Sequence, residues 1–191
     1  RDCLIPRADT EFVCEKALSL LPENARAADL CTGSGCIAIA LAKHGGAHVF
    51  ACDISAGAIE KAKENAAANG VSALTEFSVA DVKSDALEGE YDMIISNPPY
   101  IRTADIAGLG ESIGYEPYIA LDGGGDGMDF YRAILRYAPS HLKADGKIIF
   151  EIGYDEEDEI KSLAASFGLG CEVFRDYGGN PRAAVIFRKE E

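Results

Sequence analysis

The sequence contains no tryptophan and only three histidines among its 191 residues. None of its six cysteines forms a Cys-x-x-Cys pair, and His44, His48 and His141 do not cluster near a cysteine. Protein zinc sites usually show such spacing. We therefore expect no bound metal, cysteines that are reduced and behave as small hydrophobic residues, and histidines that are structural or solvated.

Long apolar segments are missing as well. The longest apolar stretches, such as residues 37–42, are far shorter than the roughly 20 residues that a membrane-spanning helix needs. The first residues also lack the apolar stretch and the small-residue cleavage site of a signal peptide. The sequence therefore predicts a cytoplasmic protein without a membrane segment.

Basic residues are few: 18 lysines and arginines stand against 32 aspartates and glutamates, a formal net charge of −14. This charge repels phosphate backbones, so direct nucleic-acid binding is not expected. Hydrophobic residues make up 48% of the chain, which is typical of a globular protein. At this length we expect a single monomeric domain over residues 1–191.

Short apolar runs alternate with segments in which apolar residues have helical spacing. Strands are predicted at residues 25–30, 48–52, 74–79, 91–96 and 147–152, and helices at 9–21, after Gly35 to residue 42, and at 56–69, 128–142 and 156–167. Residues 101–126 are rich in glycine and are expected to form a functional loop with one short helix at most.

The last two predicted strands, residues 171–175 and 183–188, are joined by a connection too short for a crossover helix, so they are expected to pair antiparallel. The alternation before them predicts helices on both faces of a parallel sheet. The expected fold is α/β: a Rossmann-like, doubly wound, mostly parallel seven-stranded sheet with an antiparallel C-terminal hairpin.

A glycine turn, Cys31-Thr32-Gly33-Ser34-Gly35, follows the first predicted strand. Its glycines allow the backbone to approach a ligand, and the next helix begins with unpaired N–H groups. Asp53 ends the second strand, where a carboxylate can accept hydrogen bonds from both hydroxyls of a ribose. The pair indicates a nucleotide-type ligand, although a glycine turn alone can be purely structural.

A dinucleotide dehydrogenase would share these two features. Its glycine fingerprint is only partly met by Gly33-x-Gly35-x-x-Ala38, and no acid or base for hydride transfer is evident downstream. Asp81, at the end of the third strand, is placed to meet an adenine amino group, and the alternative is a solvated turn aspartate. The choice of ligand therefore depends on the fourth strand.

The fourth strand leads into Asn97-Pro98-Pro99-Tyr100. The two prolines stiffen the turn, so the Pro98 carbonyl and the Asn97 side-chain oxygen are expected to converge as two acceptors for an NH2 group. Tyr100 is expected to lie against a planar amide or amine. The alternative is a proline turn that merely ends a strand.

Two fixed acceptors suit methyl transfer to an amide nitrogen from the sulfonium of S-adenosylmethionine, with S-adenosylhomocysteine as product. An amide nitrogen is a weak nucleophile because its lone pair is delocalised, and accepting both N–H protons orients it toward the methyl group. Alignment of this kind is worth roughly 7–11 kcal/mol in well-oriented reactions. No strong base is required, because the proton leaves after the methyl group has transferred.

The chain resembles the catalytic domain of the HemK family, the peptide chain release factor glutamine methyltransferases. The matching elements are Ile5-Pro6-Arg7-Ala8-Asp9-Thr10-Glu11, the glycine turn, Asp53, Asn97 to Tyr100, Tyr115-Glu116-Pro117 and Arg175-Asp176-Tyr177-Gly178. The resemblance implies a class I methyltransferase fold, S-adenosylmethionine as cofactor and the Gly-Gly-Gln loop of class 1 release factors as substrate.

Together with the residues at the strand ends, the family resemblance also implies two groups of site residues. The substrate glutamine would be held by Asn97, Pro98, Pro99 and Tyr100. The cofactor would contact Cys31, Thr32, Gly33, Ser34, Gly35, Asp53, Asp81, Val82 and Asn97.

Three residues depart from the family pattern. Ala8 replaces a usual proline, Cys31 a common glycine, and Val82 a larger apolar residue, so weaker cofactor packing is expected. The family also carries a helical amino-terminal domain, which this chain is expected to lack. Glu116 and Glu151 are expected either to border the pocket or to be exposed or turn-stabilising.

Two other functions stay open. A DNA or RNA methyltransferase acting on adenine or guanine amino groups would use the same asparagine and stacking aromatic residue on a flipped base. The acidic charge disfavours it. A catalytically silent domain that only binds a nucleotide or a partner is the other alternative.

Overall fold

The computed structural model describes residues 7–109 and 117–189. Ile5, Pro6, Tyr115 and Glu116, which carry part of the family resemblance, lie outside the described residues, and so does Cys3. The expectations for these residues are therefore not tested by the structure.

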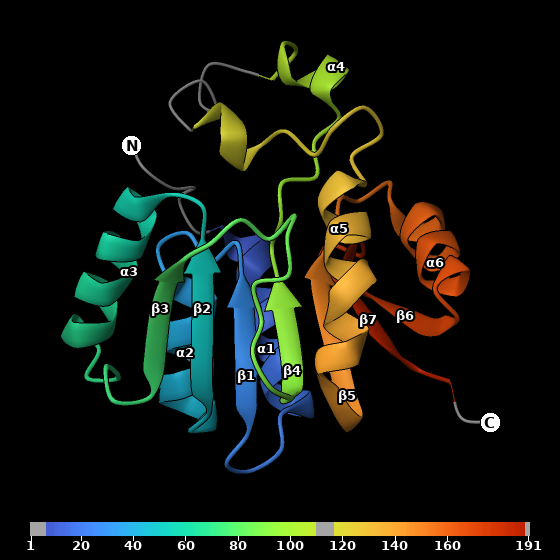
Figure 1. Ribbon diagram of the computed structural model, residues 1–191. Helices are drawn as coiled ribbons and strands as arrows, with labels where there is room; N and C mark the ends of the chain where they lie inside the picture. Colours follow the sequence, from blue (N-terminus) through green and yellow to red (C-terminus); the bar gives the residue numbers. More distant parts are fainter. Residues whose placement is uncertain (1–6, 110–116, 190–191) are drawn as a thin grey trace.

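The described residues form one seven-stranded sheet with the strand order β3-β2-β1-β4-β5-β7-β6 (Figure 1). The strands β1 to β5 pair in parallel, whereas β7 runs antiparallel to both β5 and β6. The predicted fold is thereby confirmed, including the C-terminal hairpin. The strand bounds are β1 Arg26–Leu30, β2 His48–Asp53, β3 Thr75–Val79, β4 Tyr91–Ser96, β5 Leu142–Glu151, β6 Leu169–Arg175 and β7 Pro181–Arg188.

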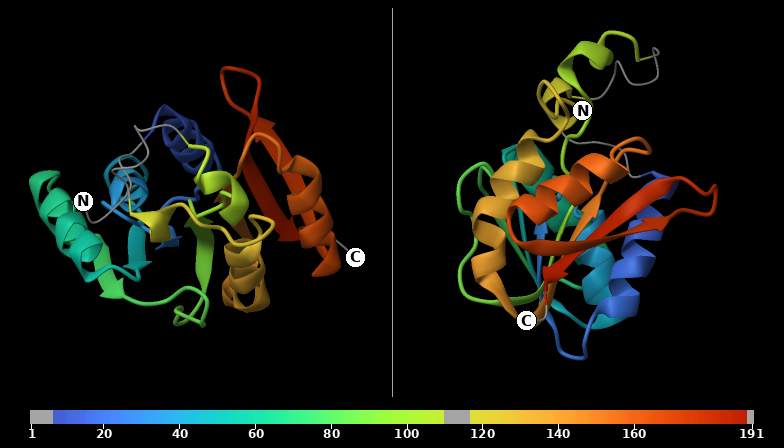
Figure 2. Two further views of the ribbon diagram at one scale, coloured as in Figure 1. Left: turned by 90° about the horizontal axis from the view of Figure 1, so that it is seen from above. Right: turned by 90° about the vertical axis from the view of Figure 1, so that its right-hand side faces the viewer.

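Helices cover both faces of the sheet (Figure 2). The helices α1, α2 and α3 pack on one face, and α5 and α6 pack on the other. A short helix, α4, lies beyond the carboxyl ends of the strands. The helix bounds are α1 Ala8–Leu20, α2 Cys36–Gly45, α3 Ala56–Ala68, α4 Thr103–Ile106, α5 Asp129–Tyr137 and α6 Glu157–Ser166, with 3-10 turns η1 Tyr118–Ala120 and η2 Ala138–His141.

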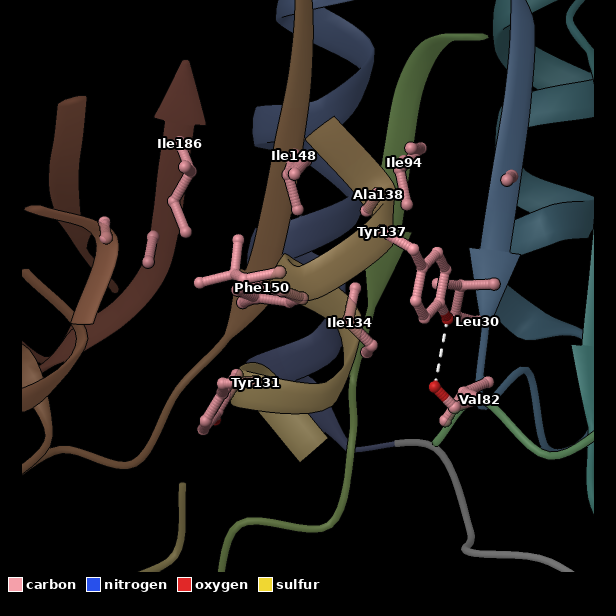
Figure 3. Close-up of a cluster of buried hydrophobic side chains, with 14 of the residues drawn as sticks. Leu30, Val82, Ile94, Tyr131, Ile134, Tyr137, Ala138, Ile148, Phe150 and Ile186 are labelled. Carbon is pink, nitrogen blue, oxygen red and sulfur yellow. Dashed lines mark hydrogen bonds between the residues drawn. The ribbon is translucent and has the colours of Figure 1, made fainter. Parts of the chain in front are cut away.

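The core consists of two clusters, because successive side chains of a strand point to opposite faces. In β1, Ala27 belongs to the cluster under α1 and α2, whereas Ala28 belongs to the cluster under α5. Figure 3 shows the second cluster, in which Ile134 of α5 packs among side chains of β4 and β5. Burial on both faces explains why these strands are continuous apolar runs.

The structure departs from the sequence expectation between α5 and β5. The predicted helix 128–142 ends at Tyr137 and tightens into η2, whose Pro139 has no N–H for a continuing helix. Strand β5 then begins at Leu142 rather than at residue 147. The early part was not predicted because residues 143–145 are exposed and polar or small, and the pairing with β4 shifts register after Tyr91.

The turn between β1 and α2 is held by a buried carboxylate. Asp29 is fully buried, and its Oδ2 accepts hydrogen bonds from Thr32 Oγ1 at 2.5 Å and from Ala38 N at 3.0 Å. Gly35 precedes α2 with a φ of +81°. A side chain there would meet Ala62 of α3, whose Cβ lies 2.9 Å from the position of an added Cβ. Glycine is therefore required both by the backbone conformation and by the close approach of α3.

Gly35→Ala is expected to destabilise the fold by about 2–4 kcal/mol, because the left-handed backbone strain adds to overpacking against Ala62. Gly46→Ala is the matched control, since Gly46 also has a positive φ of +66° but open space around it. That variant is expected to lose only about 1–2 kcal/mol. Urea denaturation measures both free energies, and equal losses would contradict the packing argument.

Stability is expected to fall as the pH rises from about 4 to about 7, between the unfolded and the folded pKa of Asp29. Burial raises the pKa of the Asp29 carboxyl to about 7, despite its hydrogen bonds from Thr32 and Ala38. The folded state therefore retains a proton that the unfolded chain has already released above about pH 4, and this contribution disappears as the pH passes the folded pKa. Asp29→Asn should give a smaller decline, measured by denaturation across this range; an unchanged slope would contradict this role of Asp29.

Candidate functional site

A cleft opens at the carboxyl ends of the central strands and encloses about 1100 Å³ of space, its open mouth included. Ligands bind at this edge of open α/β sheets, where the strand order reverses. Of the predicted site residues, the cleft is lined by Cys31, Thr32, Gly33, Ser34, Asp53, Asp81, Val82, Asn97 and Pro99. Gly35, Pro98 and Tyr100 do not line it.

Asp53 connects the glycine turn with the end of β2. Its Oδ2 accepts a hydrogen bond from Gly33 N at 2.9 Å, and its Oδ1 accepts one from Ser55 N, also at 2.9 Å. An ionised carboxylate has about four acceptor positions, so capacity for further donors remains. Asp53 can thus shape the turn and accept from ribose hydroxyls in the same cleft.

An apolar wall continues the cleft beyond Asp53. It includes Ile54, Val82, Ile119 and Phe130, and a flat heterocyclic ring suits such surfaces. Val82 is fixed because its carbonyl accepts a hydrogen bond from the Tyr137 hydroxyl at 3.0 Å (Figure 3). Ile54, Ile119 and Phe130 were not predicted from the sequence, although Ile54 directly follows Asp53.

Asp81 is a solvated turn aspartate, which was one of the two predictions for it. Its Oδ1 accepts a hydrogen bond from Lys83 N at 2.9 Å, and the residue is exposed. Because the carboxylate also lines the cleft, a contact with an adenine amino group stays a prediction.

Asn97 lies beside the glycine turn because β4 pairs with β1. Leu30 is in register with Ser96, and Ser96 Oγ donates a hydrogen bond to Leu30 O at 2.6 Å. Pro98 and Pro99 are buried. The next residue, Tyr100, is half-buried, and burial raises the pKa of its hydroxyl to about 12, so it stays neutral.

The segment after Tyr100 is anchored by main-chain contacts. Ile101 N donates to Leu121 O at 3.0 Å, and Gly123 N donates to Ile101 O at 2.8 Å. A Cβ at Gly123 would lie 2.6 Å from Tyr100 Cα, so glycine is needed for this approach. The described part of the predicted functional loop therefore packs against the Asn97–Tyr100 turn.

Asn97 is supported from the side of α1. Its Nδ2 donates to Thr10 Oγ1 at 3.3 Å, and Thr10 Oγ1 donates to Glu151 Oε2 at 2.7 Å. Glu151 is only 3% exposed and does not line the cleft, so neither a pocket-border position nor an exposed one is correct. Burial raises the pKa of its carboxyl to about 7, against the hydrogen bond from Thr10 and the charge of Arg182.

Residues 7–109 and 117–189 contain no candidate metal cluster and no candidate membrane-spanning helix. No group of three or more histidine, cysteine, aspartate or glutamate side chains is placed there to hold a metal ion. Within the same ranges, no helix has both the length and the apolar character to cross a membrane.

The chain is similar in sequence to known methyltransferases. A family model described as "Methyltransferase small domain" matches residues 12–113. The release factor glutamine methyltransferase of Moorella thermoacetica is 40% identical over 193 residues, covering 98% of this chain and 68% of the relative. The enzyme of the same name from Cereibacter sphaeroides is 42% identical, covering 95% and 66%. The chain thus spans about two thirds of the length of these relatives.

Solved structures agree on the fold. The ribosomal protein L11 methylase of Lactobacillus delbrueckii subsp. bulgaricus superimposes with a TM-score of 0.72 at 24% identity, covering 97% of this chain and 81% of that one. A methyltransferase from Pyrococcus furiosus gives the same TM-score at 21% identity, covering 97% and 84%. At these identities the likeness establishes the class I methyltransferase fold, and the sequence relatives carry the finer assignment: the chain belongs to the release factor glutamine methyltransferase family.

Proposed function

We propose that this chain transfers a methyl group from S-adenosylmethionine to the side-chain amide nitrogen of the glutamine in the Gly-Gly-Gln loop of class 1 release factors. The observation that carries the proposal is a single cleft lined both by the glycine turn with Asp53 and by Asn97. Relatives named release factor glutamine methyltransferase support the choice of substrate.

The donor set of the cleft fits S-adenosylmethionine. Asp53 would hold the ribose, the backbone of Gly33 and Ser34 would approach the methionine part, and the wall around Val82 would take the adenine. When bound, S-adenosylmethionine supplies a methyl group activated by a sulfonium sulfur, and S-adenosylhomocysteine is the product.

The residues of the chain bind and orient the amide. The side-chain oxygen of Asn97 accepts one N–H group of the glutamine at the wall of the cleft, and we assign the other to the carbonyl of Pro98, which adjoins Asn97 but does not itself line the cleft. Two acceptors would fix the nitrogen and its lone pair. Pro99 borders the cleft. Tyr100 follows it and stays neutral with a pKa of about 12, and we assign to it the restriction of the amide plane although it does not itself line the cleft. Positioning is the main catalytic contribution, since well-aligned reactions gain roughly 7–11 kcal/mol.

The partner is a release factor rather than a nucleic acid. A net charge of −14 repels phosphate backbones, which disfavours the alternative of methylating adenine or guanine in DNA or RNA. We further propose that the chain acts as a monomer and in the cytoplasm, where release factors work.

Incubation of the chain with S-adenosylmethionine and a class 1 release factor should add one methyl group to the loop glutamine, located by mass spectrometry. Asn97→Ala removes one of the two acceptors and should slow the reaction about a hundredfold or more, as loss of a single preorganised hydrogen-bonding group does in other enzymes. Methylation of DNA with none on the release factor would overturn the substrate assignment, and an Asn97→Ala variant as fast as the wild type would overturn the role of Asn97.

Asp53→Asn should weaken S-adenosylmethionine binding about 10- to 100-fold, because hydrogen bonds to a charged group are worth about 1.5–3 kcal/mol. Isothermal titration calorimetry measures the dissociation constant. Asp158→Asn is the matched control, since Asp158 is an exposed aspartate in the first turn of α6 and does not line the cleft. Equal affinities for the two variants would show that Asp53 does not contact the cofactor.

A further inference from the structure

We propose that Thr10 and Glu151 are positioning residues that determine which end of the Asn97 side-chain amide faces the cleft. The inference rests on the proposed function, in which the oxygen of Asn97 accepts a hydrogen bond from the substrate NH2. An asparagine amide can rotate to present either its oxygen or its nitrogen. If the Asn97 nitrogen faced the cleft, two hydrogen-bond donors would meet, the Asn97 NH2 and the substrate NH2, and no hydrogen bond would form.

The register of the sheet brings the three groups together. Ser96 of β4 is paired with Phe150 of β5, so the following residues, Asn97 and Glu151, are neighbours at the same edge. Thr10, in the first turn of α1, lies at this edge and contacts both side chains. These contacts connect segments that are 141 and 87 residues apart in sequence.

The direction of the hydrogen bonds follows from the chemistry of the groups. An ionised carboxylate only accepts, so Thr10 must donate its hydroxyl proton to Glu151. The Thr10 oxygen can then only accept from Asn97, and it therefore selects Nδ2. The 2.7 Å and 3.3 Å distances agree with this order. Oδ1 of Asn97 is consequently the end left for the cleft.

Burial makes this arrangement selective. Thr10 and Glu151 are 5% and 3% exposed, so a misdirected donor or acceptor at this place cannot readily turn to solvent. A buried unsatisfied polar group costs about 1–3 kcal/mol. The reversed amide would point Oδ1 of Asn97 at the Thr10 oxygen, whose only proton is donated to Glu151, so two acceptors would face each other.

Arg182 of β7 favours the ionised form of Glu151. Its guanidinium is buried, donates to Ile152 O at 3.2 Å and lies 3.4 Å from the carboxylate of Asp9. The positive charge of Arg182 lowers the pKa of Glu151, whereas burial and the charge of Asp9 raise it. The balance leaves the Glu151 carboxyl with a pKa of about 7.

The orientation should therefore depend on pH. Below its pKa, Glu151 becomes neutral and can donate to Thr10, which frees the hydroxyl proton for Oδ1 of Asn97 and permits the reversed amide. Other titratable groups face Glu151: Asp9 and Cys14 on α1, Cys36 on α2, Tyr100 after β4, and Tyr131 on α5. Burial raises the pKa of both thiols and both phenols, which keeps these groups neutral near pH 7.

Glu156 supplies a matched control. It is a second buried glutamate whose carboxyl has a pKa raised to about 7 by burial. Its Oε2 accepts from Gly153 N and from the Tyr131 hydroxyl rather than from Thr10 or Asn97. A pH-dependent change at Asn97 that is lost in Glu151→Gln but kept in Glu156→Gln therefore reports the proposed contact.

The first test needs no substrate. In the 15N-labelled chain, the side-chain NH2 resonances of Asn97, assigned by their loss in Asn97→Asp, are followed by NMR from about pH 5.5 to about pH 8.5. The resonances should shift with a midpoint near the Glu151 pKa of about 7 in the wild type and in Glu156→Gln, and should not shift in Glu151→Gln. A shift that persists in Glu151→Gln, or that is absent in the wild type, would overturn the inference.

The second test follows turnover on a class 1 release factor. Thr10→Val keeps the shape of the side chain but removes both hydrogen bonds, and kcat/KM should fall about 10- to 100-fold. Thr10→Ser retains the hydroxyl and should recover most of that loss. Equal rates for Thr10→Val and the wild type would contradict the positioning role. A wild-type chain that methylates no release factor would instead refute the proposed function, and the NMR titration would still test whether Asn97 responds to Glu151.

Discussion

The pairing of β1 with β4 is the contact on which the site depends. Leu30 and Ser96 are in register, and the Ser96 hydroxyl donates to the Leu30 carbonyl at 2.6 Å. Because both strands run in parallel, their following turns leave the sheet at the same edge. The glycine turn that starts at Cys31 and the acceptor group of Asn97 are thereby placed in one cleft, although they are far apart in the chain.

Three carboxylates then fix the parts of this edge. Asp29 accepts a hydrogen bond from the start of α2, and Asp53 accepts one from the glycine turn. Glu151 accepts one from Thr10, whose oxygen in turn accepts one from Asn97. Burial raises the pKa of Asp29 and of Glu151 to about 7, so keeping either group ionised in the folded chain costs stability. In exchange, the hydrogen-bond acceptors of the site are held in fixed orientations. A methyl transfer without a strong base depends on such alignment.

The sequence predicted the parts of the site that follow a strand directly. Asn97, Asp53 and the glycine turn were found because buried strands are apolar runs, and proline or glycine marks where they end. Ile119 and Phe130 were missed, since they come from the glycine-rich region and from α5, where no strand end marks a position. The contact of Thr10 with Glu151 was missed because it joins residues 141 apart, and only the packing of α1 on the sheet brings them together.

The central claim is that the oxygen of Asn97, and not its nitrogen, meets a substrate amide beside the glycine turn. The most direct measurement is a crystal structure of the chain with S-adenosylhomocysteine and a peptide that contains Gly-Gly-Gln. We expect the glutamine nitrogen within about 3.2 Å of Asn97 Oδ1 and the ribose hydroxyls in hydrogen bonds to Asp53. A glutamine bound outside the cleft, or one that faces Nδ2 of Asn97, would contradict it.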